Sequence, residues 1–182
     1  MRVLIVDNGS VHVREIAKFF RDHGYEIIEP LQLNWRKVDP KTIVILSGGR
    51  RLSVLWHNRY YKNELELIRN YCGPIIGICL GFELIAHAFR EPLHFLPRRK
   101  VGAITVRVTE LGRKYFANDT AELESHRYSI RKLGKNFDIL ATSRNGIEFA
   151  KHKTRPIYGM QFHPEATRQG REILNKIATE IQ

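Results

Sequence analysis

The chain has 182 residues, of which 43% are hydrophobic and 27% are charged. These numbers fit a single globular domain over 1–182 with a sizeable core, and no apolar run reaches the roughly 18 residues of a membrane helix. The net charge of +11 permits an anionic partner, but Lys and Arg are spread along the chain without a nucleic-acid-binding motif, so we favour solvated surface charge over nucleic-acid binding.

The first half of the chain alternates short apolar, β-branched runs with helical patterns. Ser10 is a candidate N-cap, and Gly24 a candidate stop, for the first helix. Such alternation is typical of a parallel sheet with helices on both faces, whose functional loops gather at the carboxyl ends of the strands. The expected elements are strands over 2–7, 25–29 and 42–46, a strand ending near 77, and helices over 10–23, 59–71 and 82–89.

The second half has a different pattern, with short strands separated by turns such as Asn145–Gly146. It predicts antiparallel or mixed additions to the sheet, followed by a last helix. The expected elements are strands over 103–109, 137–142, 146–151 and 156–162, and a helix over 167–181.

The chain contains two cysteines, Cys72 and Cys79, and neither belongs to a CxxC motif. This sparse usage is typical of a reducing cytoplasm, which is the compartment that we expect. We expect Cys72 to be a small buried apolar residue.

Cys79 lies in the stretch Gly77-Ile78-Cys79-Leu80-Gly81, directly after an apolar run. A strand, a sharp turn with two glycines and a helix together form a setting for a nucleophile. The helix N-terminus is expected to favour the thiolate, and the N–H of Leu80 could stabilise an oxyanion. The alternative is a structural cysteine in an ordinary strand–turn–helix.

A thiol nucleophile needs a base, and the base needs an orienting group. His163-Pro164-Glu165 follows the last expected strand. A residue before proline stays extended, and residues two apart in an extended segment point to the same side. We therefore expect the side chains of His163 and Glu165 to lie together, although a surface turn would have the same sequence.

Three motifs in this order resemble those of the class I, triad-type glutamine amidotransferases: the cysteine turn, the upstream stretch 46–49 and the downstream stretch 161–165. The resemblance covers essentially the whole chain. It implies a flavodoxin-like α/β fold and a glutaminase reaction. In that reaction Cys79 attacks the glutamine carboxamide, His163 transfers protons, Glu165 orients His163, and the N–H groups of Leu80 and Gly49 form the oxyanion hole.

The same resemblance implies a substrate-binding set, in which the chain departs from the family. Gly81-Phe82-Glu83 replaces the family's Gly-His-Gln, so a carboxylate that attracts the substrate's ammonium and repels its carboxylate stands where a glutamine usually holds the substrate. Arg50-Arg51-Leu52 replaces the usual proline after the oxyanion glycines. The segment after Ser125-His126 is somewhat closer to the anthranilate type. The substrate-binding set is Gly48, Glu83, Ser125, His126, Arg127 and Tyr128.

Within the family, the stretch 151–159 and the Glu124-Ser125-His126 segment look most like the stand-alone amidotransferase subunit of archaeal GMP synthase. That likeness implies L-glutamine as substrate and a hetero-oligomeric ATP-pyrophosphatase synthetase partner that uses ATP and Mg²⁺ to activate XMP. We expect no cofactor or metal in this chain. The alternatives are a non-catalytic or regulatory paralogue, an amidotransferase of another pathway such as the anthranilate type, and a γ-glutamyl hydrolase.

Overall fold

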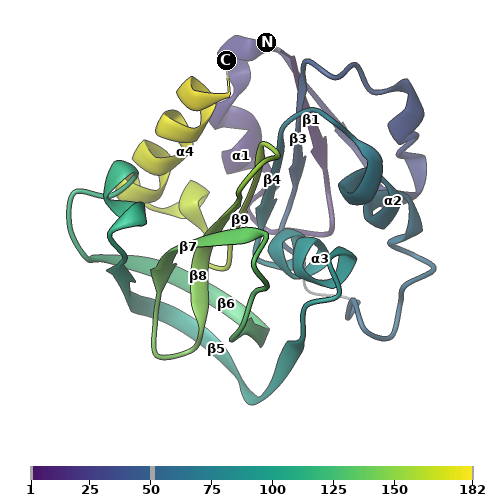
Figure 1. Cartoon of the computed structure of the whole chain (residues 1–182). Coiled ribbons are helices and arrows are strands. Elements are labelled where there is room, and N and C mark those ends of the chain that lie inside the picture. The colour runs from purple at the N-terminus through teal and green to yellow at the C-terminus, as the bar shows by residue number, and fades with distance from the viewer. Residues whose placement is uncertain (1, 50–51, 182) are drawn as a thin grey trace.

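The computed structural model describes residues 2–49 and 52–181, so the expected departure at Arg50 and Arg51 lies outside the described residues. Its centre is a nine-stranded sheet with the order β2-β1-β3-β4-β9-β8-β7-β5-β6 (Figure 1). The strands are β1 (Arg2–Val6), β2 (Tyr25–Ile28), β3 (Thr42–Leu46), β4 (Ile75–Ile78), β5 (Leu93–Val108), β6 (Thr120–Ile130), β7 (Phe137–Thr142), β8 (Ile147–His152) and β9 (Ile157–Met160).

The strands β2, β1, β3 and β4 pair in parallel, as the alternating pattern of the first half predicts. β9, which was expected among the antiparallel or mixed additions of the second half, pairs parallel to β4. Leu46 of β3 lies opposite Gly77 of β4, and Ile78 of β4 lies opposite Met160 of β9. This register brings the segments that follow three strands to one edge of the sheet. The glycines after β3, the cysteine after β4 and the histidine after β9 therefore meet there.

The remaining strands, β8, β7, β5 and β6, pair antiparallel. Two of them differ from the sequence-based expectation: β5 begins at Leu93 rather than residue 103, and β6 over Thr120–Ile130 is not foreseen. Together they form a long hairpin with an irregularity between Phe95 and Lys100. Buried positions of β6 include glutamates and a histidine, so its alternation is not one of apolar and polar residues.

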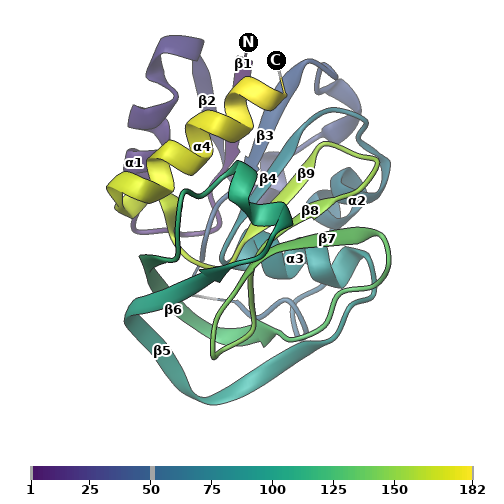
Figure 2. The same ribbon diagram turned by 60° about the vertical axis from the view of Figure 1, so that its left-hand side comes forward.

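Helices cover both faces of the parallel half, as predicted (Figures 1 and 2). Val3 and Ile5 of β1 pack in one core cluster, while Leu4 and Val6 pack in the other, which is the alternation of a strand buried on both faces. The first cluster includes residues of α1 and α4 and the second includes residues of α2 and α3. The helices are α1 (Val13–Phe19), α2 (Lys62–Asn70), α3 (Leu80–Ala88) and α4 (Arg168–Glu180).

The helix ends show where local capping differs from expectation. Ser10 does not cap α1, because its Oγ accepts the N–H of His12 in a turn before the helix. α1 ends at Phe19, and a short 3₁₀ turn leads to Gly24. Gly24 has a φ of 69°, which glycine adopts readily, and it ends the helical segment as the sequence predicts. Thr167 caps α4 by accepting the N–H of Gly170 at 2.9 Å.

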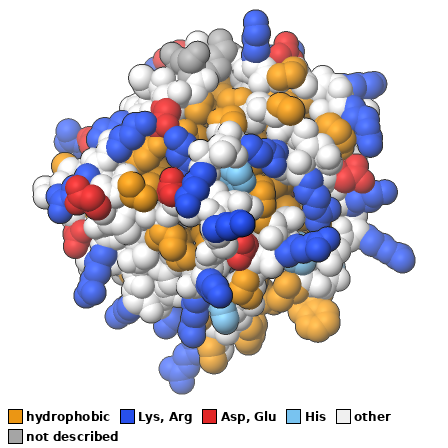
Figure 3. Space-filling view, viewed as in Figure 1, with side chains coloured by type: hydrophobic (Ala, Val, Ile, Leu, Met, Phe, Trp, Pro, Cys, Tyr) orange, Lys and Arg blue, Asp and Glu red, His pale blue; other side chains and the backbone are white. Residues whose placement is uncertain are grey.

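Cys72 lies at the surface, as do many of the basic side chains (Figure 3). Cys72 is exposed, so its expected burial is wrong; it follows the end of α2, where its Sγ lies 3.8 Å from the carbonyl oxygen of Asn70. In Figure 3 the Lys and Arg side chains are dispersed among apolar and acidic ones over the face shown. Among the residues described, no helix combines the length and apolar character needed to cross a membrane.

Candidate active site

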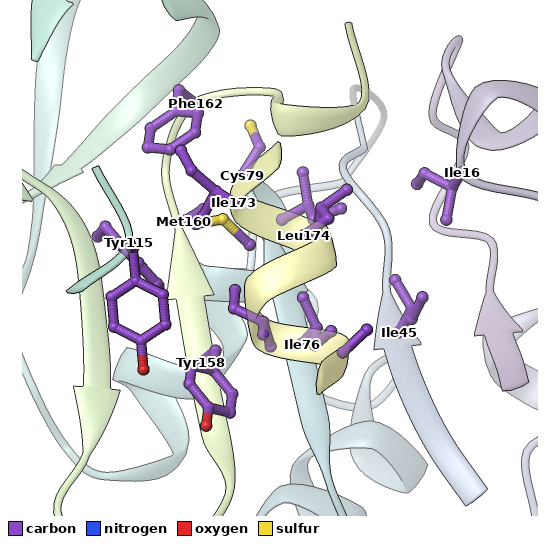
Figure 4. Close-up of a cluster of buried hydrophobic side chains, with 14 of the residues drawn as sticks. Ile16, Ile45, Ile76, Cys79, Tyr115, Tyr158, Met160, Phe162, Ile173 and Leu174 are labelled. Atoms are coloured by element: carbon purple, nitrogen blue, oxygen red, sulfur yellow. The ribbon is translucent and has the colours of Figure 1, made fainter. Parts of the chain in front are cut away.

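Cys79 occupies a strained turn between β4 and α3. Its φ of 51° and ψ of −102° are rare for a residue with a side chain. The sheet and the helix hold this conformation from both sides: the Cys79 N–H donates to the carbonyl of Met160 at 2.7 Å, and the Cys79 carbonyl accepts the N–H of Glu83 at 3.0 Å. Figure 4 shows Cys79 at the edge of the core cluster, beyond Met160.

The two glycines that flank Cys79 allow the helix to approach the sheet. A Cβ on Gly81 would lie 2.1 Å from the carbonyl oxygen of Leu46 in β3. A Cβ on Gly77 would lie 2.5 Å from Ile85 and 2.6 Å from the backbone of Gly81. Real Cβ atoms do not approach other atoms this closely. The prediction that both positions need glycine because neighbouring backbone is tight is therefore confirmed.

His163 and Glu165 form a hydrogen-bonded pair immediately after β9. The Nδ1 of His163 lies 2.9 Å from Oε1 of Glu165, and both residues are buried. The expectation that they lie together is confirmed, but its backbone reason holds only in part. Pro164–Ala166 form a 3₁₀ turn rather than an extended segment, and the N–H of His163 is anchored by the carbonyl of Leu123 at 2.8 Å.

Gly48 lies where the cysteine and the histidine converge. A Cβ at this position would stand 3.0 Å from Cε1 of His163 and 3.6 Å from Cβ of Cys79. Cys79 and His163 also line one small cavity, together with Gly49 and Ser125. The three side chains of the expected relay are therefore gathered at one edge of the sheet.

The loop of Gly48 and Gly49 is held in place by a buried polar network. A Cβ on Gly49 would lie 2.4 Å from the carbonyl oxygen of Asn8, so only glycine fits there. The Asn8 N–H donates to Ser47 Oγ at 2.9 Å, and its amide nitrogen donates to Oε1 of Glu64 at 3.0 Å. Burial raises the pKa of Glu64 to about 8, because the hydrogen bond from Asn8 offsets only part of the cost of a buried charge.

The electrostatics of Cys79 differ from the expectation. Burial, followed by the nearby carboxylates of Glu83 and Glu165, raises the pKa of the thiol well above its ordinary value. A hydrogen bond from the N–H of Leu80 and the charge of Arg99 act in the opposite direction and are outweighed. The prediction that the helix N-terminus makes Cys79 a thiolate is therefore wrong for the chain without substrate, and the thiol is protonated at neutral pH.

A larger cavity of about 380 Å³ opens beside Cys79 and is lined by most of the expected substrate-binding residues. Gly48 instead lies on the His163 side, as described above. Ser53 lies between β3 and α2, and its hydroxyl donates to the hydroxyl of Tyr128 at 3.0 Å. This contact connects the segment around Ser53 to β6 at the cavity. The expected residues on its wall are Gly49, Leu80, Glu83, Ser125, His126, Arg127 and Tyr128.

Two residues at the site were not assigned from the sequence. Arg99 lines both cavities, and its Nη2 donates to the Ser125 hydroxyl at 2.9 Å. His12 lines the smaller cavity, and its ring centroid lies 5.3 Å from that of His163. His12 could have been assigned to the site from the sequence, because it follows shortly after the carboxyl end of the first strand. Arg99 could not, because it lies in a part of β5 that the sequence pattern did not predict.

Beneath the larger cavity, Glu124, His126 and Glu148 place one potential metal-ligand atom each within 4.8 Å of one another. The His126 Nε2 is hydrogen-bonded to Glu124 at 3.0 Å, and Asn145 donates to both oxygens of that carboxylate. Burial alone would lower the pKa of His126, but its bonds to Glu124 and to the Tyr128 carbonyl raise it overall. The three residues therefore belong to a buried ion-paired network, in which both imidazole nitrogens of His126 already have hydrogen-bond partners.

Comparisons with known proteins agree with this geometry. A sequence model of the family Glutamine amidotransferase class-I matches residues 4–181. The chain is 34% identical to a protein of Methanocaldococcus jannaschii named as a subunit of glutamine-hydrolyzing GMP synthase, over 94% of this chain and 93% of that protein. It is 29% identical to the glutamine-hydrolyzing GMP synthase of Mesoplasma florum, where it covers 99% of its own length but spans only 36% of that longer protein.

Among solved structures, a Thermoplasma acidophilum protein described as a GMP synthase subunit superposes with a TM-score of 0.86 at 26% identity. The match covers 98% of this chain and 92% of that one. The family match, the similar relatives and the fold agree with the three motifs from the sequence. The chain belongs to the class I glutamine amidotransferase family.

Proposed function

We propose that the chain, acting as one amidotransferase domain over 1–182, hydrolyses L-glutamine to glutamate and ammonia. The observation that carries this proposal is the convergence of Cys79 with the bonded pair of His163 and Glu165 beside a cavity of about 380 Å³. A cavity of this size accommodates a single amino acid.

In the proposed reaction, the sulfur of Cys79 attacks the carbonyl carbon of the glutamine carboxamide. Because the thiol is protonated at rest, its proton passes to His163 as the carbon–sulfur bond forms. The Nδ1–H of His163 donates to Oε1 of Glu165, which leaves Nε2 as the nitrogen that takes up this proton.

The same proton then leaves with the amide nitrogen as ammonia, and a γ-glutamyl thioester remains on Cys79. Water, activated by His163, hydrolyses the thioester to glutamate. The N–H groups of Leu80 and Gly49 stabilise the oxyanion in both steps, and one such donor contributes about 3 kcal/mol in well-studied enzymes.

We further propose that the ammonia passes to a separate synthetase subunit that converts XMP to GMP with ATP and Mg²⁺. The relatives named as GMP synthase subunits support this assignment, because the chain covers nearly their whole length. The longer GMP synthases support it as well, since the chain matches about a third of each.

Ammonia release tests the proposal directly. Wild-type chain and Cys79→Ser are assayed with L-glutamine, alone and with an ATP-pyrophosphatase synthetase, XMP and ATP. We expect ammonia and GMP from the wild-type mixture and neither glutamate nor GMP from the Cys79→Ser mixture supplied with glutamine. Absence of glutamine turnover and of glutamine binding in both mixtures would favour a non-catalytic paralogue. Turnover of γ-glutamyl peptides without a partner would favour a γ-glutamyl hydrolase.

A further inference from the structure

The cavity beside Cys79 has charged residues of both signs on its wall. Glu83 comes from the first turn of α3, and Arg99 comes from the irregular part of β5. Both lie close enough to Cys79 for their charges to act on its thiol, in opposite directions. Burial raises the pKa of Glu83 to about 7, against the charge of His126 and the hydrogen bond from Gln161, so the carboxylate is mostly ionised above that pH. A cavity that then has one anionic and one cationic group beside the nucleophile suits a zwitterionic ligand.

Arg99 is held at the cavity by Ser125. Its Nη2 lies 2.9 Å from the hydroxyl and 3.4 Å from the carbonyl oxygen of Ser125, and that carbonyl oxygen lies 3.8 Å from Sγ of Cys79. Both of these contacts use the same nitrogen, and among the described residues the other guanidinium N–H groups have no acceptor. A fork of donors therefore remains for a carboxylate.

Arg127, the second arginine among the described residues of this wall, is engaged differently. Its guanidinium carbon lies 5.6 Å from the centre of the Phe95 ring, in a cation–π contact at the exposed side of the hairpin. Arg127 does not line the smaller cavity that contains Cys79 and His163, whereas Arg99 does. Among the residues that the structure describes, Arg99 is therefore the arginine that lines the cavity of the reacting centre.

Glu83 is buried, with 4% of its surface exposed, and its only side-chain hydrogen bond among the described residues is from Gln161 to Oε1 at 3.4 Å. Its other oxygen has no donor within the described part of the chain. A buried carboxylate with so few donors gains from a cation that enters the cavity. The ammonium of an amino acid is such a cation.

We infer that Arg99 and Glu83 form a subsite for the α-amino-acid head of the substrate, with Arg99 binding the α-carboxylate and Glu83 binding the α-ammonium. This inference rests on the proposed glutaminase function and names how the site distinguishes free glutamine from other amides. Four carbon–carbon bonds of about 1.5 Å each separate the carboxamide carbon of glutamine from its α-carboxylate carbon. The Sγ of Cys79 and the Nη2 of Arg99 contact the same carbonyl oxygen of Ser125, at 3.8 Å and 3.4 Å, so Arg99 is within reach of the carboxylate of a glutamine whose carboxamide lies at Sγ.

The first experiment compares two alkylating probes on Cys79. 6-Diazo-5-oxo-L-norleucine carries the amino-acid head of glutamine, and iodoacetamide does not. Rates of Cys79 modification are measured by peptide mass spectrometry for wild type, Arg99→Gln and the matched control Arg98→Gln. The ratio of the two rates is the readout, because a general change in thiol reactivity affects both probes.

We expect Arg99→Gln to lower this ratio about tenfold, the loss expected for one charge-assisted hydrogen bond, and Arg98→Gln to leave it unchanged. Equal ratios in Arg99→Gln and Arg98→Gln would overturn the inference while leaving the glutaminase proposal intact. Failure of the diazo probe to modify wild-type Cys79 that iodoacetamide does modify would overturn both.

The second experiment tests Glu83 with N-acetyl-6-diazo-5-oxo-L-norleucine, which lacks the ammonium. At pH 8.5 we expect wild type to react about tenfold faster with the free amine than with the acetylated probe. Glu83→Gln, which keeps the size of the side chain, is expected to reduce that preference severalfold. An unchanged preference in Glu83→Gln would remove Glu83 from the subsite.

Discussion

Gly81→Ala is a sharp test of how the cysteine turn is built, because two effects of opposite sign compete. Alanine in place of glycine in a helix interior is favourable by about 1 kcal/mol, which is an upper limit for Gly81 because it is the second residue of α3. The structure opposes this gain, since the added Cβ would stand 2.1 Å from the backbone carbonyl oxygen of Leu46 and 2.9 Å from its Cβ.

The steric effect should dominate, because the atom in the way is backbone of a fully buried strand. A normal contact would require α3 to move away from β3 by about 1 Å, and overpacking of this kind costs about 3 kcal/mol or more. We therefore expect a net loss of at least about 2 kcal/mol in the free energy of unfolding, or a Tm lower by about 4–8 °C in a chain of this size.

Urea denaturation and calorimetry measure this loss, and Gly134→Ala is the matched control. At Gly134 the nearest obstacle is Oε1 of Glu91 at 2.6 Å, the far end of a flexible side chain that accepts the Gly134 N–H, so we expect a change of about 1 kcal/mol, the worth of one loosened hydrogen bond. If Gly81→Ala were as stable as wild type, helix propensity would outweigh the close approach, and our interpretation of the turn would be wrong.

Two further changes test the relay and the buried carboxylates. Glu165→Gln should lower kcat for ammonia release by about 10²–10⁴-fold with little change in KM, because the amide cannot stabilise a protonated His163; an unchanged kcat would contradict the assigned orientation. Glu64 binds a proton in the folded chain up to a pKa of about 8, well above its unfolded value, so its contribution to stability falls as pH rises from about 4.5 to about 8. Glu64→Gln should therefore flatten the pH dependence of the unfolding free energy in urea titrations, and an identical slope in both proteins would refute the assignment.

The parallel half of the fold could be predicted because its signals are local and apolar. Thr42–Leu46 is fully buried on both faces, and a continuous β-branched run of that kind is distinctive. The strand over Thr120–Ile130 was missed for the opposite reason. Its inward positions include Glu122, Glu124 and His126, whose burial is possible only through partners on other strands and turns that no local pattern shows.

The site followed the same division. The pattern of parallel strands predicted that the Gly48–Gly49 loop and Cys79 converge, because the carboxyl ends of parallel strands meet at one edge whatever their separation along the chain. That His163 and Glu165 join them was implied by the family resemblance and not by the strand pattern. The sequence did not predict Arg99, whose role depends on a hairpin irregularity that brings it to Ser125. It also indicated the wrong charge state for Cys79, because desolvation depends on packing from the whole fold.

The protonated thiol has a consequence for how the reaction is controlled. Burial and, after it, the charges of Glu83 and Glu165 oppose ionisation of Cys79, so the resting site holds a weak nucleophile despite its position at a helix N-terminus. An ammonium bound at Glu83 would neutralise one of these opposing charges at the moment when the carboxamide reaches the sulfur. The same carboxylate that replaces the family's glutamine would then couple recognition of the substrate to activation of the thiol, and a ligand without the ammonium would react with Cys79 more slowly.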